Sequence, residues 1–516
     1  GKLVKDVGSL AGSTLTHVLV DSWEAECQNW SDELIEQFKK HRGYDPTPYL
    51  PVTQGFIIDS EEISERFLWD FRRTLADLHA DVFYKTVTEL ANADGLELWS
   101  EVYNPANFDT FQSVSRVDVP MTEFWFNHPL HRGFAKHAAS VAHALGKPIV
   151  PAEAFTATPE SAGWQSHPFA LKHTADIAFA DGVNQIIFHT WPHQPWPELS
   201  PGITLGQYGI QFTAQNTWFD QATEWVDYLT RCQFILQQGQ FLADVAIFSE
   251  EDAPNNLGRT DNAGREGMPH GYDYDYLNVD VLANATVENG RITLPSGMSY
   301  RLLVFKKSHT MTPKLARKVR ELVQDGALIL GPKPKRSPSL VGYPECDNEV
   351  RAIADVVWGD VNGKNVKEHA FGKGRVYDGM TIEAVLKSDG VSPDMLWSEG
   401  KLNWEHRQID GTDFYFVSSR EKKSVSTELS LNIEGKIPEF WYPGTGKTET
   451  CGVWRTDKGR TIIPLELDPY GSRFIVFRKA GAPLVTDLEA SFEHEGYELV
   501  ITKAMYGSVV SDASDK

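Results

Sequence analysis

The sequence predicts an α/β protein: part of a (β/α)8-type barrel, then a smaller α/β domain, then a C-terminal β-sandwich. In the first half, short apolar runs alternate with helix-length segments, which indicates parallel strands joined by helices. Beyond about residue 390 the apolar runs become short and alternating and are separated by turn residues, which is typical of a sandwich. We therefore expect the barrel portion in residues 1–240, the smaller α/β domain in 241–389, and the sandwich with a polar tail in 390–516.

The first region holds about five β/α units. Ser60–Asp94 is predicted to be one long helix, because its apolar residues recur at three and four positions; Ser60 can cap its start and Gly95 can end it. The other elements expected here are strands at Leu15–Val20, Leu96–Trp99, Val117–Met121 and Gln185–His189, a strand that starts at Pro148–Val150, and helices at His131–Leu145, Pro168–Ala180 and Trp218–Gln238.

Five strands are too few to close a barrel of eight. If Gln185–His189 is the eighth strand, Leu15–Val20 is the fourth, and the first three lie upstream of Gly1. We therefore expect an open five-stranded parallel sheet with an exposed edge at Leu15–Val20, and an upstream barrel segment that is missing from this chain.

The second region repeats the α/β pattern without a cluster of catalytic residues. No GxGxxG motif opens it, so a nucleotide site there has no support. The expected elements are strands at Asp244–Phe248, Arg301–Phe305 and Ala327–Gly331 and helices at Tyr274–Leu282 and Thr312–Asp325. In the third region Pro443–Thr448 resembles a phosphate loop, but Trp441 stands where such a loop needs glycine, so we predict a hairpin turn.

Charge and composition exclude several functions. The net charge of −22 repels phosphate backbones and anionic lipid surfaces, so neither nucleic acid nor a membrane is an expected partner. No apolar run approaches the ~18 residues that a membrane-spanning helix needs. The four cysteines are far apart and form no CxxC pair, which argues against a zinc ribbon or a disulfide framework.

Four glutamates stand at or just after the ends of predicted strands: Glu24, Glu101, Glu123 and Glu153. In a barrel this end carries the active site, because all strands deliver side chains to one mouth. Glycoside hydrolysis generally needs two carboxyl groups, one protonated and one ionised. The alternative is that these carboxylates are only solvated or cap the next helix.

Other residues near these strand ends are suited to sugar binding or to a metal. Aromatic faces pack against the C–H faces of sugar rings, although such residues equally serve as core. The candidate substrate-binding residues are Asp21, Trp23, Glu101, Trp125, His189, Trp191 and His193. Asp21 and the glutamates also offer the hard oxygen ligands that Ca²⁺ prefers, but no EF-hand loop is present. Pro192 and Pro195 break helical spacing around His189 and His193, so a zinc pair there is disfavoured.

Several blocks of the sequence resemble the α-L-rhamnosidases of glycoside hydrolase family 106. They are long enough to be fairly specific, and together they cover most of the chain. They are Asp21–Glu24 with Gln28–Trp30, Phe38–Asp45, Pro48–Pro51, Ser64–Thr74, Asp118–Trp125, Tyr272–Asp275 and Pro469–Ser472. The chain is similar to the C-terminal part of that family, whose proteins are much longer.

The resemblance implies an inverting, exo-acting hydrolase that removes terminal α-L-rhamnose from glycans or glycosides. It also implies a barrel with glutamate acid and base residues and a Ca²⁺ ion that contacts the sugar. We assign Glu24 as acid and Glu153 as base, with Glu123 as the rival base. For the calcium ligands we take Asp21, Glu101 and Glu123. By the same resemblance a periplasmic or extracellular location is expected.

Two other functions stay open. One is a different barrel glycosidase or a polysaccharide lyase; a lyase favours a basic or tyrosyl site and an acidic substrate, which the charge of −22 disfavours. The other is a truncated, non-catalytic carbohydrate-binding relative, against which the four strand-end glutamates argue mildly.

Overall fold

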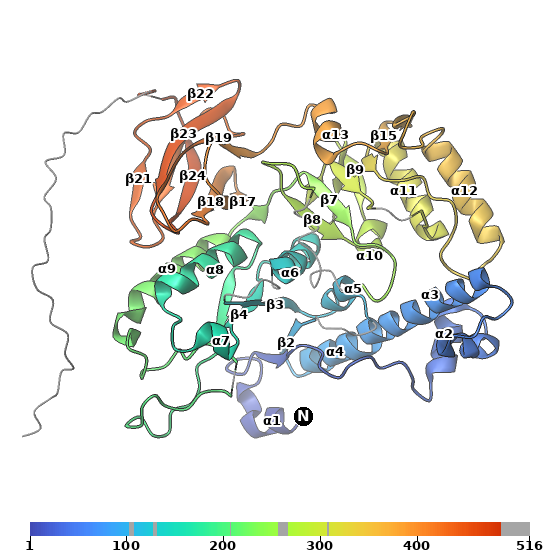
Figure 1. Cartoon of the computed structure of the whole chain (residues 1–516), viewed down its shortest axis with the longest axis horizontal. Helices are drawn as coiled ribbons and strands as arrows, with labels where there is room; N and C mark the ends of the chain where they lie inside the picture. The colour runs from blue at the N-terminus through green and yellow to red at the C-terminus, as the bar shows by residue number, and fades with distance from the viewer. Residues whose placement is uncertain are drawn as a thin grey trace, which may run out of the picture.

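A five-stranded parallel sheet forms the centre of the first region (Figure 1). The computed structural model describes residues 1–102, 108–126, 132–206, 208–255, 267–306, 309–483 and 485–486. The strands follow one another in chain order: β1 (His17–Val20), β2 (Glu97–Glu101), β3 (Val119–Trp125), β4 (Pro151–Thr156) and β5 (Gln185–Phe188). The predicted open sheet is confirmed, with β1 at one edge and β5 at the other.

Helices connect these strands and cover the sheet. The shorter helices predicted from the sequence are present with similar bounds, and the bounds of α8 are those predicted. The helical elements of this region are α1 (Lys2–Val7), η1 (Gly8–Leu10), α2 (Leu34–Arg42), η2 (Thr47–Gln54), α3 (Glu61–Leu78), η3 (His79–Tyr84), α4 (Lys85–Ala93), α5 (Thr110–Val114), α6 (Arg132–Leu145), α7 (Pro159–Ala162), α8 (Pro168–Ala180), η4 (Phe219–Gln221) and α9 (Ala222–Leu236).

The long helix predicted at Ser60–Asp94 is present but changes its winding. The Ser60 side chain accepts a hydrogen bond from the Ile63 amide, as expected of an N-cap. The segment η3 between α3 and α4 is a π-helix, whose extra residue per turn rotates everything after it. As a result Val82 and Leu90, which belong to the apolar residues that predict this helix, are exposed and not buried.

A second, mainly parallel sheet follows in the order β14-β15-β13-β12-β7-β8. Its strands are β7 (Val245–Phe248), β8 (Tyr274–Leu277), β12 (Leu302–Val304), β13 (Leu328–Leu330), β14 (Glu368–Phe371) and β15 (Gly374–Tyr377), and only β14 runs antiparallel. The helices are α10 (Val279–Ala283), α11 (Pro313–Asp325), α12 (Glu345–Val357) and α13 (Ile382–Ser388); β9 (Thr286–Glu288), β10 (Arg291–Thr293) and β11 (Ser299–Tyr300) form a small separate sheet.

The helix predicted at Tyr274–Leu282 is wrong. Tyr274–Leu277 is a strand buried on both faces, so its apolar and aromatic residues carry no helical period. Asn278 then caps the short helix α10 by accepting a hydrogen bond from the Val281 amide. The expected helix therefore combined the whole strand β8 with most of the helix that follows it.

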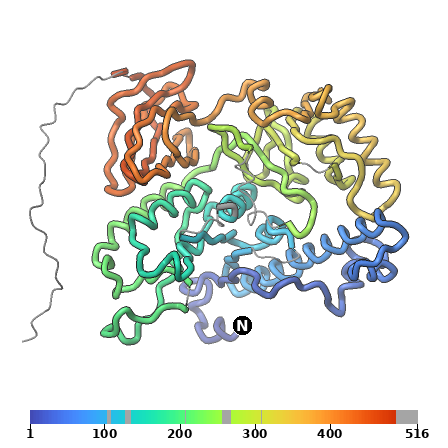
Figure 2. The backbone as a smooth tube through the Cα atoms, in the orientation of Figure 1, coloured from blue at the N-terminus to red at the C-terminus, as the bar shows by residue number. Residues whose placement is uncertain are grey.

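The two α/β regions share one hydrophobic core. Leu98 and Val141 of the first region lie in the same buried cluster as Val245 and Leu303 of the second. A buried ion pair adds to this contact: Arg66 on α3 donates to Asp347 on α12 at 2.7 Å. Figure 2 shows the N-terminal helices running beneath the second region, so the two regions hold each other in place.

Two antiparallel sheets complete the described chain. One has the order β16-β19-β23-β22 and the other β21-β20-β24-β18-β17-β6, and residues of both sheets share a core that includes Leu429 and Ile475. Their strands are β6 (Gln240–Phe241), β16 (Met395–Trp397), β17 (Leu402–Ile409), β18 (Thr412–Ser419), β19 (Val425–Leu431), β20 (Lys436–Trp441), β21 (Thr448–Thr450), β22 (Arg455–Asp457), β23 (Arg460–Leu467) and β24 (Ser472–Ala480).

Pro443–Thr448 connects β20 to β21, and the Lys447 carbonyl accepts a hydrogen bond from the Tyr442 amide, so the predicted hairpin turn is confirmed. The polar tail expected at the C-terminus lies outside the described residues. Within the described part of the chain, no helix is both long enough and apolar enough to cross a membrane.

Candidate active site

The register of the first sheet brings its acidic residues to one face. Glu123 pairs with Glu153, and Glu101 pairs with Met121, two residues before Glu123. Side chains of register partners, and of residues two apart on a strand, project to the same side of a sheet. Glu101, Glu123 and Glu153 therefore share one face toward the carboxyl end of the sheet. Glu101 ends β2, whereas Glu123 and Glu153 lie inside β3 and β4 and not at or after the strand ends expected from the sequence.

Three carboxylates converge at this edge. Single side-chain oxygens of Asp21, Glu101 and Glu153 all lie within 4.8 Å of one another. Asp21 directly follows β1, Glu101 ends β2 and Glu153 lies in β4. Three like charges at this separation repel one another unless a cation or a proton lies among them. Carboxylate oxygens are the ligands that Ca²⁺ prefers, so the three residues fit a calcium ion.

This cluster differs in one residue from the expected ligand set. Asp21 and Glu101 were both expected, whereas the third carboxylate is that of Glu153 and not of Glu123. Glu123 is the neighbour of Glu153 on the next strand and is almost fully buried.

Two further polar side chains lie beside Glu153. The Thr156 hydroxyl donates a hydrogen bond to Glu153 Oε1, and Nδ1 of His189 lies 3.5 Å from the same oxygen. Residues three apart in a regular strand point to opposite faces. Phe155 between them has φ 68°, an uncommon backbone conformation for a bulky residue, and the pairing of β3 with β4 shifts register at Phe124/Trp125. This irregularity turns Thr156 toward Glu153, a contact that the sequence pattern does not signal.

Glu24 lies beyond the end of β1 on an irregular segment. It is exposed, and its Oε1 accepts a hydrogen bond from the Ser22 hydroxyl at 3.1 Å. The backbone amide of Ser22 in turn donates to Asp21 Oδ1 at 2.8 Å. Ser22 thus links the exposed glutamate to the converging carboxylates. The sequence placed Glu24 and Asp21 at this strand end but gave no reason to single out Ser22.

The aromatic and histidine residues predicted to bind sugar differ in their surroundings: some pack against other side chains, and others are exposed. Trp23 packs edge-on against His79 and Phe83 of η3, with ring centroids 4.7 and 5.3 Å away, so its indole contacts the helix. Trp125 is half-buried and meets Tyr208 edge-on. Trp191 and His193 follow β5 and are exposed, whereas His189 lies beside the carboxylate of Glu153.

A family model described as alpha-L-rhamnosidase, of glycoside hydrolase family 106, matches residues 1–455. The chain belongs to this family. The family is one of glycoside hydrolases, and its match includes every strand-end carboxylate discussed above.

Two relatives are similar to almost the whole of this chain. A protein of Formosa agariphila named as a putative beta-glucuronidase is 36% identical over 99% of the chain and 43% of its own length. The rhamnosidase from Novosphingobium sp. PP1Y is 33% identical, with a TM-score of 0.87 over 94% of this chain and 47% of that one. The chain thus spans less than half the length of each.

A more distant structure has the same fold. The beta-galactosidase from Bacillus circulans sp. alkalophilus matches 92% of this chain and 82% of its own, with 16% identity and a TM-score of 0.58. At this identity the likeness concerns the fold alone.

Proposed function

We propose that this protein is a glycoside hydrolase that releases terminal α-L-rhamnose from glycans or glycosides with inversion at the anomeric carbon. The observation that carries the proposal is the meeting of Asp21, Glu101 and Glu153 at the carboxyl edge of the first sheet. Membership of the rhamnosidase family supports the choice of sugar. We also expect the protein to act in the periplasm or outside the cell, where such glycans are met.

The proposed reaction uses two carboxyl groups. Glu24, protonated, donates its proton to the glycosidic oxygen as the bond to the anomeric carbon breaks. Glu153 accepts a proton from a water molecule that attacks the opposite face of the sugar, which inverts the configuration. Such a pair needs about 6.5–9.5 Å between carboxyl groups to make room for the water. Thr156, as a hydrogen-bond donor to Glu153, would hold that carboxylate in orientation.

Calcium is the cofactor that we propose for this site. Asp21, Glu101 and Glu153 would hold it, and Glu123 is the neighbouring carboxylate available as an alternative base. A bound calcium ion supplies positive charge and fixes hydroxyl groups of the sugar. Because Glu153 belongs to the cluster, the residues that hold the ion would also fix the position of the proposed base.

A uronic acid is a poorer substrate for this edge than a neutral sugar. The Formosa agariphila relative carries the name of a glucuronidase, and a glucuronide has a carboxylate that needs a cationic partner. Even with one calcium ion bound, the three converging carboxylates keep a net negative charge, which would repel that group. The same argument disfavours a lyase that acts on an acidic polysaccharide.

The test is hydrolysis of 4-nitrophenyl α-L-rhamnopyranoside by the native full-length protein, compared with 4-nitrophenyl β-D-glucuronide. We expect activity on the rhamnoside only, with an inverted product seen by NMR. Glu24→Gln and Glu153→Gln should each lower kcat by roughly 10²–10⁴-fold. Glu33→Gln, an exposed glutamate in the same segment as Glu24, is the control that should change nothing.

Other outcomes of this assay count against specific parts of the proposal. A large loss in Glu123→Gln with normal rates in Glu153→Gln would make Glu123 the base. Retention of configuration would contradict the inverting mechanism. Binding of the rhamnoside without turnover would favour the non-catalytic carbohydrate-binding relative.

A further inference from the structure

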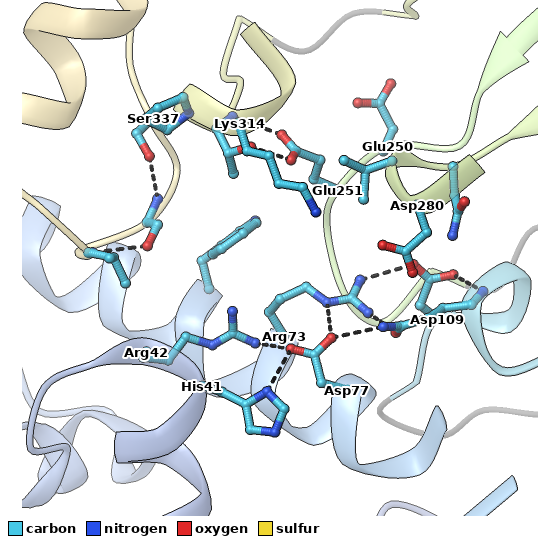
Figure 3. A pocket seen from close by; sticks show the side chains of 18 of the residues that line it. His41, Arg42, Arg73, Asp77, Asp109, Glu250, Glu251, Asp280, Lys314 and Ser337 are labelled. Atoms are coloured by element: carbon cyan, nitrogen blue, oxygen red, sulfur yellow. Dashed lines mark hydrogen bonds and ion pairs between the residues drawn. The ribbon is translucent and has the colours of Figure 1, made fainter. Parts of the chain in front are cut away.

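A cavity of about 410 Å³ lies away from the strand-end carboxylates, between α3 and the second sheet (Figure 3). Trp69 and Arg73 of α3, Glu250 and Glu251 after β7, and Lys314 of α11 are among its lining residues. None of the acidic residues of the candidate active site lines it. Its volume falls within the ~300–1,000 Å³ of small-molecule pockets.

The topology of the second sheet favours a ligand at this place. The chain passes from β7 to β8 on one side and then to β12 on the other side of β7. In open parallel sheets, ligands bind outside the carboxyl ends of the strands where the strand order reverses in this way. Glu250 and Glu251 follow the end of β7, and Lys314 lies in the helix after β12. The cavity is therefore at the expected crevice.

Most of the charged groups of the cavity neutralise one another. Arg73 donates to Asp77 at 3.2 Å and to Asp109 at 2.9 Å, and Figure 3 shows these groups side by side along one wall. Glu251 occupies the start of α11, where it accepts hydrogen bonds from the amide and the hydroxyl of Thr312. Because that helix end and that guanidinium are already satisfied by carboxylates, the cavity offers little to a phosphate or another anion.

Three other side chains of the cavity wall can contact a ligand. Trp69 is half-buried, and its indole N–H donates to Asp252 at 2.6 Å, which fixes the ring in the cavity wall. The ammonium group of Lys314 points toward the middle of the cavity and has no ion pair among the described residues. Glu250 has φ 29°, a strained backbone conformation of the kind that occurs at functional sites. Burial raises the pKa of its carboxyl group to about 7, so it both donates and accepts hydrogen bonds near neutral pH.

We propose that this cavity binds a neutral sugar unit, stacked on Trp69 and hydrogen-bonded by Glu250 and Lys314, as a second carbohydrate site. A neutral ligand is favoured because most charges of the walls are paired, and the two that are left, Lys314 and Glu250, are of opposite sign. Its identification as a sugar rests in part on the proposed function, because a glycoside hydrolase meets long glycans. A second site would hold a distant part of the glycan while its terminal sugar reacts.

The first experiment is a crystal structure of the full protein with methyl α-L-rhamnopyranoside. Sugar in both places supports both proposals. Sugar only at the strand-end carboxylates overturns the second site and leaves the proposed function standing. Sugar only in the cavity supports the second site and counts against the proposed function. Inorganic phosphate that displaces the sugar from the cavity would overturn its assignment as a neutral-ligand site.

The second experiment measures affinity by a ligand-observed NMR titration with the same glycoside. Lys314→Ala and Glu250→Ala should each weaken binding at the cavity by about tenfold or more, because each removes a side chain that hydrogen-bonds the sugar. Lys314 is exposed, so its replacement should not disturb folding. Arg320→Ala, exposed on the same helix but outside the cavity, is the matched control. Unchanged affinity in both variants would overturn the proposal.

Discussion

The carboxylates of Asp21, Glu101 and Glu153 stand close enough for their repulsion to destabilise the folded protein unless it is compensated. A divalent cation that binds only the folded state raises stability by mass action, by ~2.7 kcal/mol at a hundred times its Kd. We therefore expect calcium to raise the Tm of the wild-type protein, and chelation to reverse the effect. Differential scanning calorimetry with and without calcium measures this directly.

Asp21→Asn and Glu101→Gln should abolish the calcium-dependent increase in Tm. Asp32→Asn, which removes an exposed acid of the same irregular segment, should preserve it. An equal increase in Tm in all four proteins would show that calcium binds elsewhere. This readout is independent of catalysis, so it remains valid if the assignment of acid and base is wrong.

A buried histidine in the C-terminal sheets makes stability depend on pH. His406 Nδ1 lies 2.7 Å from Asp394, its Nε2 lies 3.4 Å from Asp413, and its ring stacks on Tyr415. Burial alone lowers the pKa of His406, but the two carboxylates outweigh burial and raise it to about 9. Because the folded-state pKa exceeds the unfolded value of ~6.5, this contribution is complete below that pH and is lost as pH rises toward 9.

Denaturant unfolding at a series of pH values should therefore show the wild-type free energy of unfolding falling between about pH 6.5 and 9. His406→Gln should be less stable at pH 7, by about 1–3 kcal/mol, because Asp394 loses its cation, whereas Asp413 keeps its ion pair with Lys436. The free energy of unfolding of this variant should also depend much less on pH in this range. His369→Gln, at a half-buried histidine in β14, should keep the slope. A wild-type slope that persists in His406→Gln would assign it to other groups.

At the scale of elements, the π-helix η3 decides which face of the long helix is buried. Leu75 precedes it and is 6% exposed, whereas Leu90 follows it and is 65% exposed. Leu75→Ala should cost about 2–5 kcal/mol, because it leaves a cavity in a packed cluster. Leu90→Ala should stay within about 0.5 kcal/mol. Equal losses in thermal unfolding would mean that the helix keeps one continuous face in solution.

The same helix shows which parts of the fold a sequence can predict. Its length, its Ser60 cap and its stop at Gly95 are local signals, and they were predicted. The π-helix is a change of winding that no residue type indicates, so the apolar periodicity does not predict that Val82 and Leu90 are exposed. The strand β8 was not predicted for a related reason. A short strand that is buried on both faces lacks the alternation of apolar and polar residues that indicates a strand.

The candidate active site was partly predictable because strand ends in a parallel sheet meet at one edge. This rule brought Asp21, Glu101 and Glu153 together without knowledge of any distance. It did not give Thr156, whose approach to Glu153 depends on a local irregularity of the backbone. The sequence does not predict the cavity, because the contacts that form it are long-range. Trp69, for example, contacts Asp252, which lies 183 residues further along the chain.

At the scale of the whole molecule, the first sheet has two edges without a strand partner among the described residues, at β1 and at β5. Leu19 of β1 is 52% exposed and Ile187 of β5 is 37% exposed, so apolar side chains accompany the open backbone edges. Unpaired edges with exposed apolar residues favour association with another strand. We expect the polypeptide of residues 1–516, purified alone, to self-associate as its concentration rises.

Sedimentation velocity over a range of concentrations tests this expectation. Leu19→Lys should reduce association, because a lysine on an edge strand opposes pairing with another chain. Leu199→Lys replaces a leucine of similar exposure that lies outside the sheet, and it should leave association unchanged. If the wild-type polypeptide stays monomeric at every concentration, the open edge is protected by something other than a second strand. If both lysine variants reduce association equally, general surface charge and not the β1 edge controls it.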